Sequence, residues 1–166
     1  MLSVYVMTEK QIELIRQSWL LVKPASKEAG IAFYEKLFAA APGIRHLFKK
    51  DVTEQAEKLM NMLSFVVSKL DGLEGIITDI TALGARHHQY GAKPEHYDVV
   101  GNCLIETLKD GLAEKWNTEL QQAWIAAFTI IKTAMVAAQK TGSCTNEIIK
   151  DAAACNGKYS QHNLKS

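Results

Sequence analysis

Apolar residues recur along most of this chain at spacings of three and four, which is the period of an α-helix. No segment alternates cleanly at the period of two that is typical of a half-buried β-strand. Thr8 and Gln11 match a capping box, so a first helix is expected to run through about residue 22. Its inward residues are Ile12, Ile15 and Trp19. The pattern therefore predicts an all-α protein.

Turn and capping signals divide the middle of the chain. A second helix is expected over about 26–40, and Pro42 opens a short helical turn. Asp51 with Glu54 predicts a cap for a helix that reaches about residue 70. The segment DGLEG at 71–75 is expected to be a loop, and a helix over about 74–89 follows it.

The last part of the pattern holds two more helices. Gly91 ends the preceding helix, and Pro94 occupies the first turn of a helix that runs to about residue 112. Thr118 with Gln121 predicts the cap of the last long helix, which ends at Gly142. Residues 1–142 are thus expected to form one domain of six or seven packed helices, with its core in 8–141. Residues 143–166 are polar and are expected to be a loosely held tail, with one short helix near 146–154.

Composition changes this picture little. The chain has 166 residues, 48% of them apolar, and its 19 basic residues nearly balance 18 acidic ones. A net charge of +1 gives no reason to expect a nucleic-acid or anionic-membrane partner. The opening MLSVYVM lacks the features of a signal peptide, and no stretch approaches eighteen consecutive apolar residues. We therefore expect a cytoplasmic protein that does not span a membrane.

The three cysteines, Cys103, Cys144 and Cys155, are widely spaced and match neither a zinc motif nor a disulfide framework. Reduced thiols are the simplest interpretation. A disulfide between Cys144 and Cys155, or one between two molecules, stays open.

Two adjacent histidines, His87 and His88, are the first candidates for functional residues. On the helix before Gly91, His87 continues the apolar stripe of Ile76, Ile80 and Leu83, whereas His88 lies roughly 100° around the helix. A histidine on an apolar face is either a core residue with satisfied nitrogens or a ligand of a metal. A non-haem zinc or iron site would need three or four converging ligands, which this stripe does not offer.

The helix over 52–70 carries apolar residues on more than one face, from Val52 and Ala56 to Phe65 and Leu70. One explanation is deep burial in an all-α core. Another is a large, flat, apolar ligand on one side of the helix and protein on the other. Gln55 is the polar residue four positions before Leu59 on the same strip.

Four motifs now occur in order: FYEKLFAAAPGIRHLF at 33–48, EQAEKLMNML at 54–63, LGARHHQYGAKPEHY at 83–97 and AW at 123–124. Together they resemble the globins, specifically bacterial single-domain globins and the haem domain of flavohaemoglobins. ELIRQSW at 13–19 is also similar to neuroglobin. The resemblance covers about residues 8–141 and implies a globin fold around haem b.

The resemblance also implies roles for individual residues. His87 would ligate the haem iron, and Tyr97 would contact His87 from the next helix. Phe48 would pack on the porphyrin and Lys58 would lie near a haem propionate. The ligand side would be formed by a distal pair, Tyr34 and Gln55, together with Leu59. Leu83 would keep the proximal side dry. His88 is expected at the surface or at the rim of the pocket, and His96 is expected to help start its helix and to contact solvent.

The sequence also differs from the flavohaemoglobin pattern in some places. Gln139 stands fifteen residues after Trp124, where flavohaemoglobins carry a glutamate, and it either joins Tyr97 in a network with His87 or faces solvent. No reductase domain follows, so electrons would come from an external donor. The resemblance implies tight binding of dioxygen, nitric oxide and carbon monoxide, with nitric oxide dioxygenation or nitrite reduction as candidate reactions. Oxygen storage, gas or redox sensing, and a haem-free helical interaction protein are the alternatives.

Overall fold

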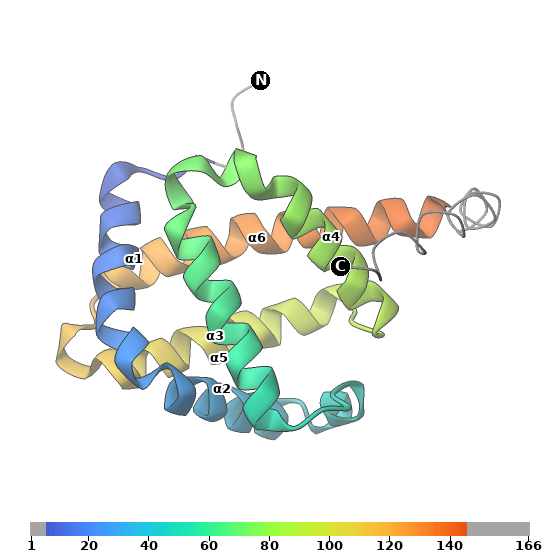
Figure 1. Ribbon diagram of the computed structural model, residues 1–166, viewed down its shortest axis with the longest axis horizontal. Helices are drawn as coiled ribbons and strands as arrows, with labels where there is room; N and C mark the ends of the chain where they lie inside the picture. Colours follow the sequence, from blue (N-terminus) through green and yellow to red (C-terminus); the bar gives the residue numbers. More distant parts are fainter. Residues whose placement is uncertain (1–5, 146–166) are drawn as a thin grey trace, which may run out of the picture.

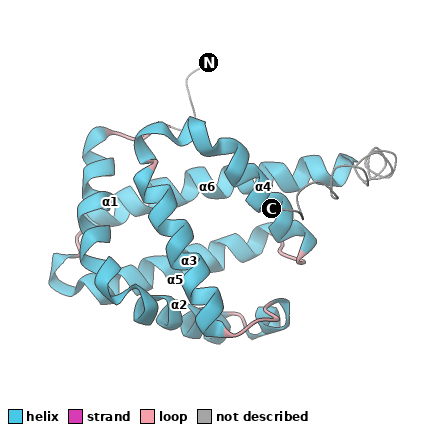
Figure 2. Ribbon diagram, viewed as in Figure 1, coloured by secondary structure: helices cyan, strands magenta, loops and turns pink. Residues whose placement is uncertain are grey.

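In the computed structural model, residues 6–145 are described, with side chains for residues 6–139. This part of the chain contains six α-helices and no strand, as Figure 2 shows, which confirms the all-α prediction. The α-helices are α1 Glu9–Val22, α2 Ser26–Ala40, α3 Val52–Ser68, α4 Ile77–Gln89, α5 Pro94–Leu112 and α6 Thr118–Thr145. Short 3₁₀ segments link them: η1 Lys23–Ala25, η2 Pro42–Leu47, η3 Leu70–Ile76 and η4 Ala113–Lys115.

In the view of Figure 1, helices α1 and α3 run across the direction of α5 and α6. Helix α2 lies against α3 and α5, while α6 contacts α1, α5 and, most extensively, α4. Helices α3 and α4 follow one another in the sequence but barely touch directly. This leaves the facing sides of α3 and α4 to a cavity.

Local sequence signals explain most of the helix starts. Thr8 Oγ1 accepts from the Gln11 backbone N–H at 3.1 Å and Gln11 Oε1 accepts from the Thr8 N–H at 3.1 Å, so the predicted capping box is confirmed. Asp51 does cap α3, but its carboxylate accepts from the Thr53 N–H at 3.3 Å. The predicted partner Glu54 is turned toward lysines instead.

Three boundary predictions were wrong. Asn117, not Thr118, caps α6, because its side-chain oxygen accepts from the Leu120 N–H at 2.9 Å. Residues 71–75 lie within the 3₁₀ segment η3, which is kinked at Gly72, and do not form an open loop. Helix α6 continues through Gly142 to Thr145, since a glycine inside a helix costs only about 1 kcal/mol and does not by itself end it. Cys155, the short helix predicted near 146–154 and the rest of the tail lie outside the described residues.

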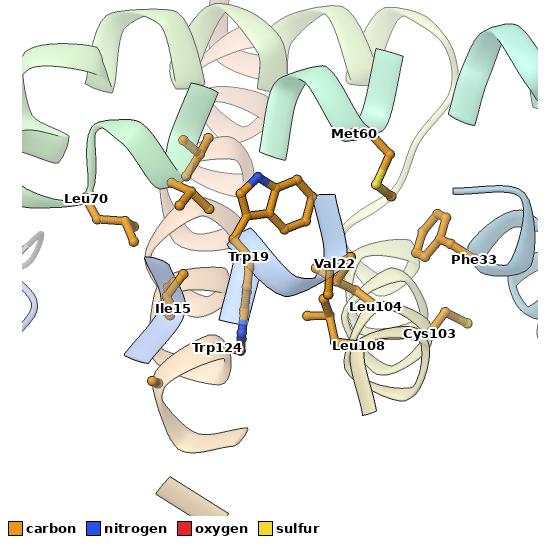
Figure 3. Close-up of a cluster of buried hydrophobic side chains, with 14 of the residues drawn as sticks. Ile15, Trp19, Val22, Phe33, Met60, Leu70, Cys103, Leu104, Leu108 and Trp124 are labelled. Carbon is orange, nitrogen blue, oxygen red and sulfur yellow. The ribbon is translucent and has the colours of Figure 1, made fainter. Parts of the chain in front are cut away.

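The centre of the core is a tryptophan pair, drawn in Figure 3. The Trp19 and Trp124 rings are 6.1 Å apart between centroids, in a tilted arrangement. The Trp124 indole N–H donates to Ser18 Oγ at 3.0 Å, and that of Trp19 donates to Ser64 Oγ at 3.1 Å. Both buried indole nitrogens are therefore satisfied, which removes the cost of an unpaired donor in the core.

Glycines permit close approach where helices cross. A Cβ added at Gly84 of α4 would stand 2.7 Å from both Cα and O of Met135 in α6. A Cβ at Gly30 of α2 would similarly stand 2.8 Å from the Ala56 Cβ of α3. Backbone atoms cannot move aside as a flexible side chain can, so α4 lies on α6 at a separation that only glycine allows.

Helix α6 bears on the expectation that the chain does not span a membrane. By length and composition, Thr118–Gln139 is apolar enough to cross a membrane, although it contains no run of eighteen apolar residues. A core helix of a soluble protein meets the same criterion. In this structure the inward face of α6 packs against other helices, with Ala123, Trp124 and Met135 among its buried residues.

We predict that Gly84→Ala destabilises the protein by about 1–3 kcal/mol, because the added methyl group overpacks a contact with backbone. Denaturant unfolding followed by circular dichroism measures this. The matched control is Gly111→Ala in α5, where a Cβ would meet nothing within 4 Å. Gly111→Ala should be neutral or stabilising, by about 0.4–1 kcal/mol. Equal effects of the two substitutions would contradict the close α4–α6 contact.

Candidate functional site

The cavity between α3 and α4 has a volume of about 260 Å³. Its walls are mainly apolar and come from these two helices alone. The residues lining it are Met62, Phe65, Val66, Asp79, Ile80, Ala82, Leu83 and Arg86. The second apolar face of α3, which the sequence indicated, is therefore the α3 wall of this cavity.

His87 lies on α4, one turn beyond Leu83, and is partly buried. Its Nδ1 is 2.8 Å from the Leu83 carbonyl oxygen. A carbonyl can only accept, so Nδ1 carries the proton and Nε2 keeps its lone pair. Burial lowers the pKa of His87 below its usual value, the bond to Leu83 opposes this, and the charge of Arg86 lowers it further. The imidazole is thus held neutral and oriented, as a metal ligand requires.

The neighbouring histidines have other surroundings. His88 is exposed, as its position around the helix predicted. His96 accepts a bond from the Lys93 backbone N–H at 3.0 Å through Nδ1, so it does help to start α5.

A buried network lies behind His87. The Tyr97 ring from α5 stands 6.4 Å from the His87 ring, measured between centroids. Gln139 of α6 is only 4% exposed, so the alternative that it faces solvent is wrong. Its amide Nε2 donates to the Tyr97 hydroxyl oxygen at 2.8 Å, while its Oε1 is buried without a partner among the described residues. Gln139 therefore contacts Tyr97, and the Leu83 carbonyl takes the bond from His87.

Aromatic rings surround Tyr34 of α2. The Phe48 ring lies 5.5 Å from the Tyr34 ring and the Phe38 ring 5.8 Å from it, between centroids. Tyr34 is 7% exposed, and its hydroxyl has no hydrogen-bond partner among the described residues. Burial raises the pKa of Tyr34 to about 12. The phenol therefore keeps its proton at neutral pH and presents an unused donor.

Arg45 holds this aromatic group in place. Its guanidinium donates to the Phe48 carbonyl at 3.1 Å and lies 4.7 Å from the centroid of the Phe38 ring. The structure thus brings Tyr34 and Phe48 together, although the sequence separates them by fourteen residues.

Helix α3 positions the remaining predicted residues. Gln55 and Leu59 are partly buried one turn apart, and Leu59 packs against the core. Lys58 is exposed and forms an ion pair with Glu54 at 3.0 Å. Glu54 also pairs with Lys50 at 2.9 Å, so both lysines share one carboxylate.

Sequence reasoning did not single out Arg86 or Asp79, which both line the cavity. A signal was present, because Arg86 lies three residues after Leu83 and so shares its side of the helix. Of the two adjacent residues, only His87 was predicted to belong to the site.

Comparison with known proteins places this arrangement in a family. A family model described as Globin matches residues 31–135. An anaerobic nitrite reductase of Casuarina glauca is 30% identical over 151 residues, covering 82% of this chain and 94% of that protein. The flavohemoprotein of Bacillus subtilis is 28% identical over 140 residues, covering 81% of this chain but only 35% of that protein. A bacterial globin structure from Campylobacter jejuni has a TM-score of 0.71 at 23% identity, covering 81% of this chain and 97% of that one. The chain belongs to the globin family.

Membership of this family implies haem binding, and the residues present fit a haem. A neutral histidine offers a free Nε2, α3 and α4 stand apart across an apolar cavity, and a buried phenol has no partner. Among the described residues, no three histidine, cysteine or carboxylate side chains lie close enough together to hold a metal ion. A porphyrin would supply the other iron ligands.

We predict that His87→Ala loses haem or binds it only when imidazole is added, because the substitution removes the Nε2 atom that is expected to ligate the iron. His88→Ala, its exposed neighbour, should keep a normal haem absorbance spectrum. The spectra of the two purified variants, with and without imidazole, decide this. Loss of haem from His88→Ala but not from His87→Ala would reverse the assignment.

We predict that Gln139→Glu lowers the reduction potential of the iron and raises the iron–histidine stretching frequency. The introduced carboxylate would accept from the Tyr97 hydroxyl and bring negative charge toward the His87 side of the site. Redox titration and resonance Raman spectroscopy measure the two quantities. Gln139→Leu, which removes the amide without adding charge, is the control. If Gln139→Glu moves neither quantity, Gln139 is not coupled to the proximal histidine.

Proposed function

We propose that this globin binds dioxygen and other diatomic gases tightly at ferrous haem b, and that it supports nitric oxide dioxygenation with electrons from a separate reductase. His87 is the iron ligand on one side, and Tyr34 with Gln55 forms the gas-binding side. The observation that carries this proposal is the buried Tyr34 side chain beside Phe48, whose hydroxyl has no hydrogen-bond partner among the described residues.

Ferrous haem, when bound, supplies the iron to which such gases attach. The protein contributes the electrostatics around the gas. A buried phenol with a pKa of about 12 remains a donor throughout the neutral range. A hydrogen bond to an acceptor that carries charge contributes about 1.5–3 kcal/mol. At about 1.4 kcal/mol per factor of ten, one such bond slows the loss of dioxygen at least roughly tenfold. Slow release suits chemistry on the gas better than delivery of it.

The proposed reaction needs a source of electrons, and the longer relatives suggest what kind of source it is. The flavohemoproteins match this chain over about one third of their own length. Their names indicate both haem and flavin, and the matched third is the globin part. We propose that an external reductase supplies the electrons.

Nitrite reduction is the second candidate. The relative from Casuarina glauca is named an anaerobic nitrite reductase and is matched over 94% of its length. One from Gossypium hirsutum has the same kind of name, is 33% identical and is matched over 85% of its length. The same ferrous site with an open gas-binding side would serve that reaction when oxygen is absent. The distal donors Tyr34 and Gln55 are present for either substrate.

Stopped-flow mixing tests the proposal. The oxygenated protein is mixed with nitric oxide, and the products are assayed for nitrate. Rapid, stoichiometric conversion to ferric protein and nitrate, repeated over many cycles with a reductase, is the expected result. In a parallel arm the anaerobic ferrous protein is mixed with nitrite. Faster turnover with nitrite would favour the second candidate, and no turnover in either arm would leave storage or sensing.

We predict that Tyr34→Phe speeds oxygen dissociation roughly tenfold or more, because it removes the hydroxyl donor and keeps the ring. Gln55→Leu should have the smaller effect. Carbon monoxide carries less charge when bound, so its dissociation should change much less in both variants. Laser photolysis and stopped-flow ligand replacement measure these rates. Unchanged oxygen dissociation in the double variant would remove both residues from the account.

A further inference from the structure

Arg16 of α1, in the motif ELIRQSW at 13–19, links α1 to the point where α3 ends. Its Nε donates to the Val67 carbonyl oxygen at 3.4 Å, and its Nη2 donates to the Ser68 carbonyl oxygen at 3.3 Å. The same Nη2 lies 3.1 Å from a carboxylate oxygen of Asp71 in η3. One guanidinium therefore contacts both the last turn of α3 and the segment that follows it.

These contacts satisfy a local need of helix α3. The last four carbonyl groups of an α-helix have no partner within the helix, and a cation near them also interacts favourably with the helix dipole. The last turn of α3 contains no basic residue of its own. Arg16 thus supplies, from another helix, the cation that the end of α3 lacks.

The turn that Arg16 holds also forms part of the cavity wall. Phe65 and Val66 line the cavity from α3, and Val66 directly precedes Val67, whose carbonyl accepts from Arg16. The opposite wall, α4, is fixed separately by the close contact of Gly84 with α6. The separation of the two walls at this end therefore depends on what holds the end of α3. Arg16 is not itself one of the residues that line the cavity.

The connection between the two walls contains a suitable hinge. Segment η3 is kinked at Gly72, where the backbone leaves helical geometry with φ −151° and ψ 46°. A Cβ at Gly72 would meet nothing within 4 Å, so no neighbouring group packs against this position. Leu70 and Leu73, on either side, are each 2% exposed and anchor η3 in the core. Bending would therefore concentrate at Gly72, one residue after the Asp71 carboxylate that pairs with Arg16.

We propose that Arg16 is a positioning residue for the haem site: it holds the end of α3 so that the cavity between α3 and α4 keeps the width at which haem is retained. This inference rests on the proposed haem-binding function. Without Arg16, two carbonyls of α3 lose their partner, and the wall at Phe65 and Val66 moves more freely about Gly72.

The rate of haem loss tests this role without any measurement of activity. Wild type and variants are loaded with haem and mixed with an excess of a haem-scavenging apoglobin, and the transfer is followed by absorbance. The matched control is Lys36→Gln, because Lys36 also joins two helices through an ion pair, with Asp110 at 2.8 Å. The Lys36 side chain is 31% exposed and that of Arg16 is 34% exposed, but Lys36 lies on α2, which does not line the cavity.

Arg16→Gln should lose haem about fivefold faster than wild type, as expected for the loss of one typical hydrogen bond. Its spectrum with haem bound should be unchanged, because His87 and the distal residues are untouched. Arg16→Lys should be intermediate, since an ammonium group keeps the charge but not the planar fork. Asp71→Asn should have a smaller effect, because an exposed ion pair contributes little and the carbonyl bonds remain. Lys36→Gln should match wild type.

Amide hydrogen exchange of the haem-loaded proteins separates a local effect from a general loss of stability. The Lys69 N–H donates to the Val66 carbonyl and the Gly72 N–H donates to the Lys69 carbonyl, both at 2.9 Å. In Arg16→Gln these amides should exchange faster, while the amides of α5 and α6 keep their wild-type rates. In Lys36→Gln the end of α3 should exchange as in wild type.

Two results would overturn the inference while leaving haem binding intact. One is haem loss from Arg16→Gln that is no faster than from Lys36→Gln. The other is exchange that becomes faster to the same extent throughout Arg16→Gln, since Arg16 would then contribute only general stability. If Arg16→Gln does not fold, Arg16→Lys is compared with Lys36→Gln by the same two criteria. If wild type takes up no haem at all, the proposed function itself fails, and the inference fails with it.

Discussion

The site depends on one packing constraint, the close contact of α4 with α6 at Gly84. Because α4 lies against the Met135 backbone of α6, it stands away from α3, and the apolar faces of α3 and α4 are left opposite each other across a cavity. Leu83 and His87 follow on the same helix, so the contact that positions α4 also sets where the imidazole lies. A side chain at residue 84 would push against backbone on α6, and the displacement would be passed directly to His87.

Burial then sets two protonation states that the proposed chemistry needs. On one side it lowers the pKa of His87, and the Leu83 carbonyl fixes the proton on Nδ1, so a lone pair remains on Nε2. On the other side it raises the pKa of Tyr34 to about 12, so the phenol keeps its proton and remains a donor. The same desolvation disfavours the charged form of each group, and it yields a neutral imidazole and a neutral phenol. Arg86 adds a nearby positive charge that further disfavours a protonated His87.

Much of the fold could be predicted from the sequence, because helical periodicity and caps act locally. The capping box of Thr8, the start of α5 at Pro94 and the apolar stripe ending in His87 follow from residues a few positions apart. Predictions failed where a neighbouring residue supplied a better cap, as Asn117 did, or where a glycine continued a helix, as Gly142 did. The partners of Lys58 and Gln139 could not be predicted, because side chains choose between near-equal contacts that only the packed structure brings into reach. Arg86 is a different case, because its spacing of three residues from Leu83 already places it on the same side of the helix.

The central claim is that His87 is the only protein ligand of the iron and that the opposite side is kept open for a gas. The absorbance spectrum of the deoxygenated ferrous protein tests it most directly. A five-coordinate, high-spin spectrum with a single broad visible band is the result that this account predicts, since the distal residues Tyr34 and Gln55 provide neutral donors and no imidazole. A six-coordinate, low-spin spectrum with two sharp visible bands would show that a second protein side chain holds the iron, and would contradict it.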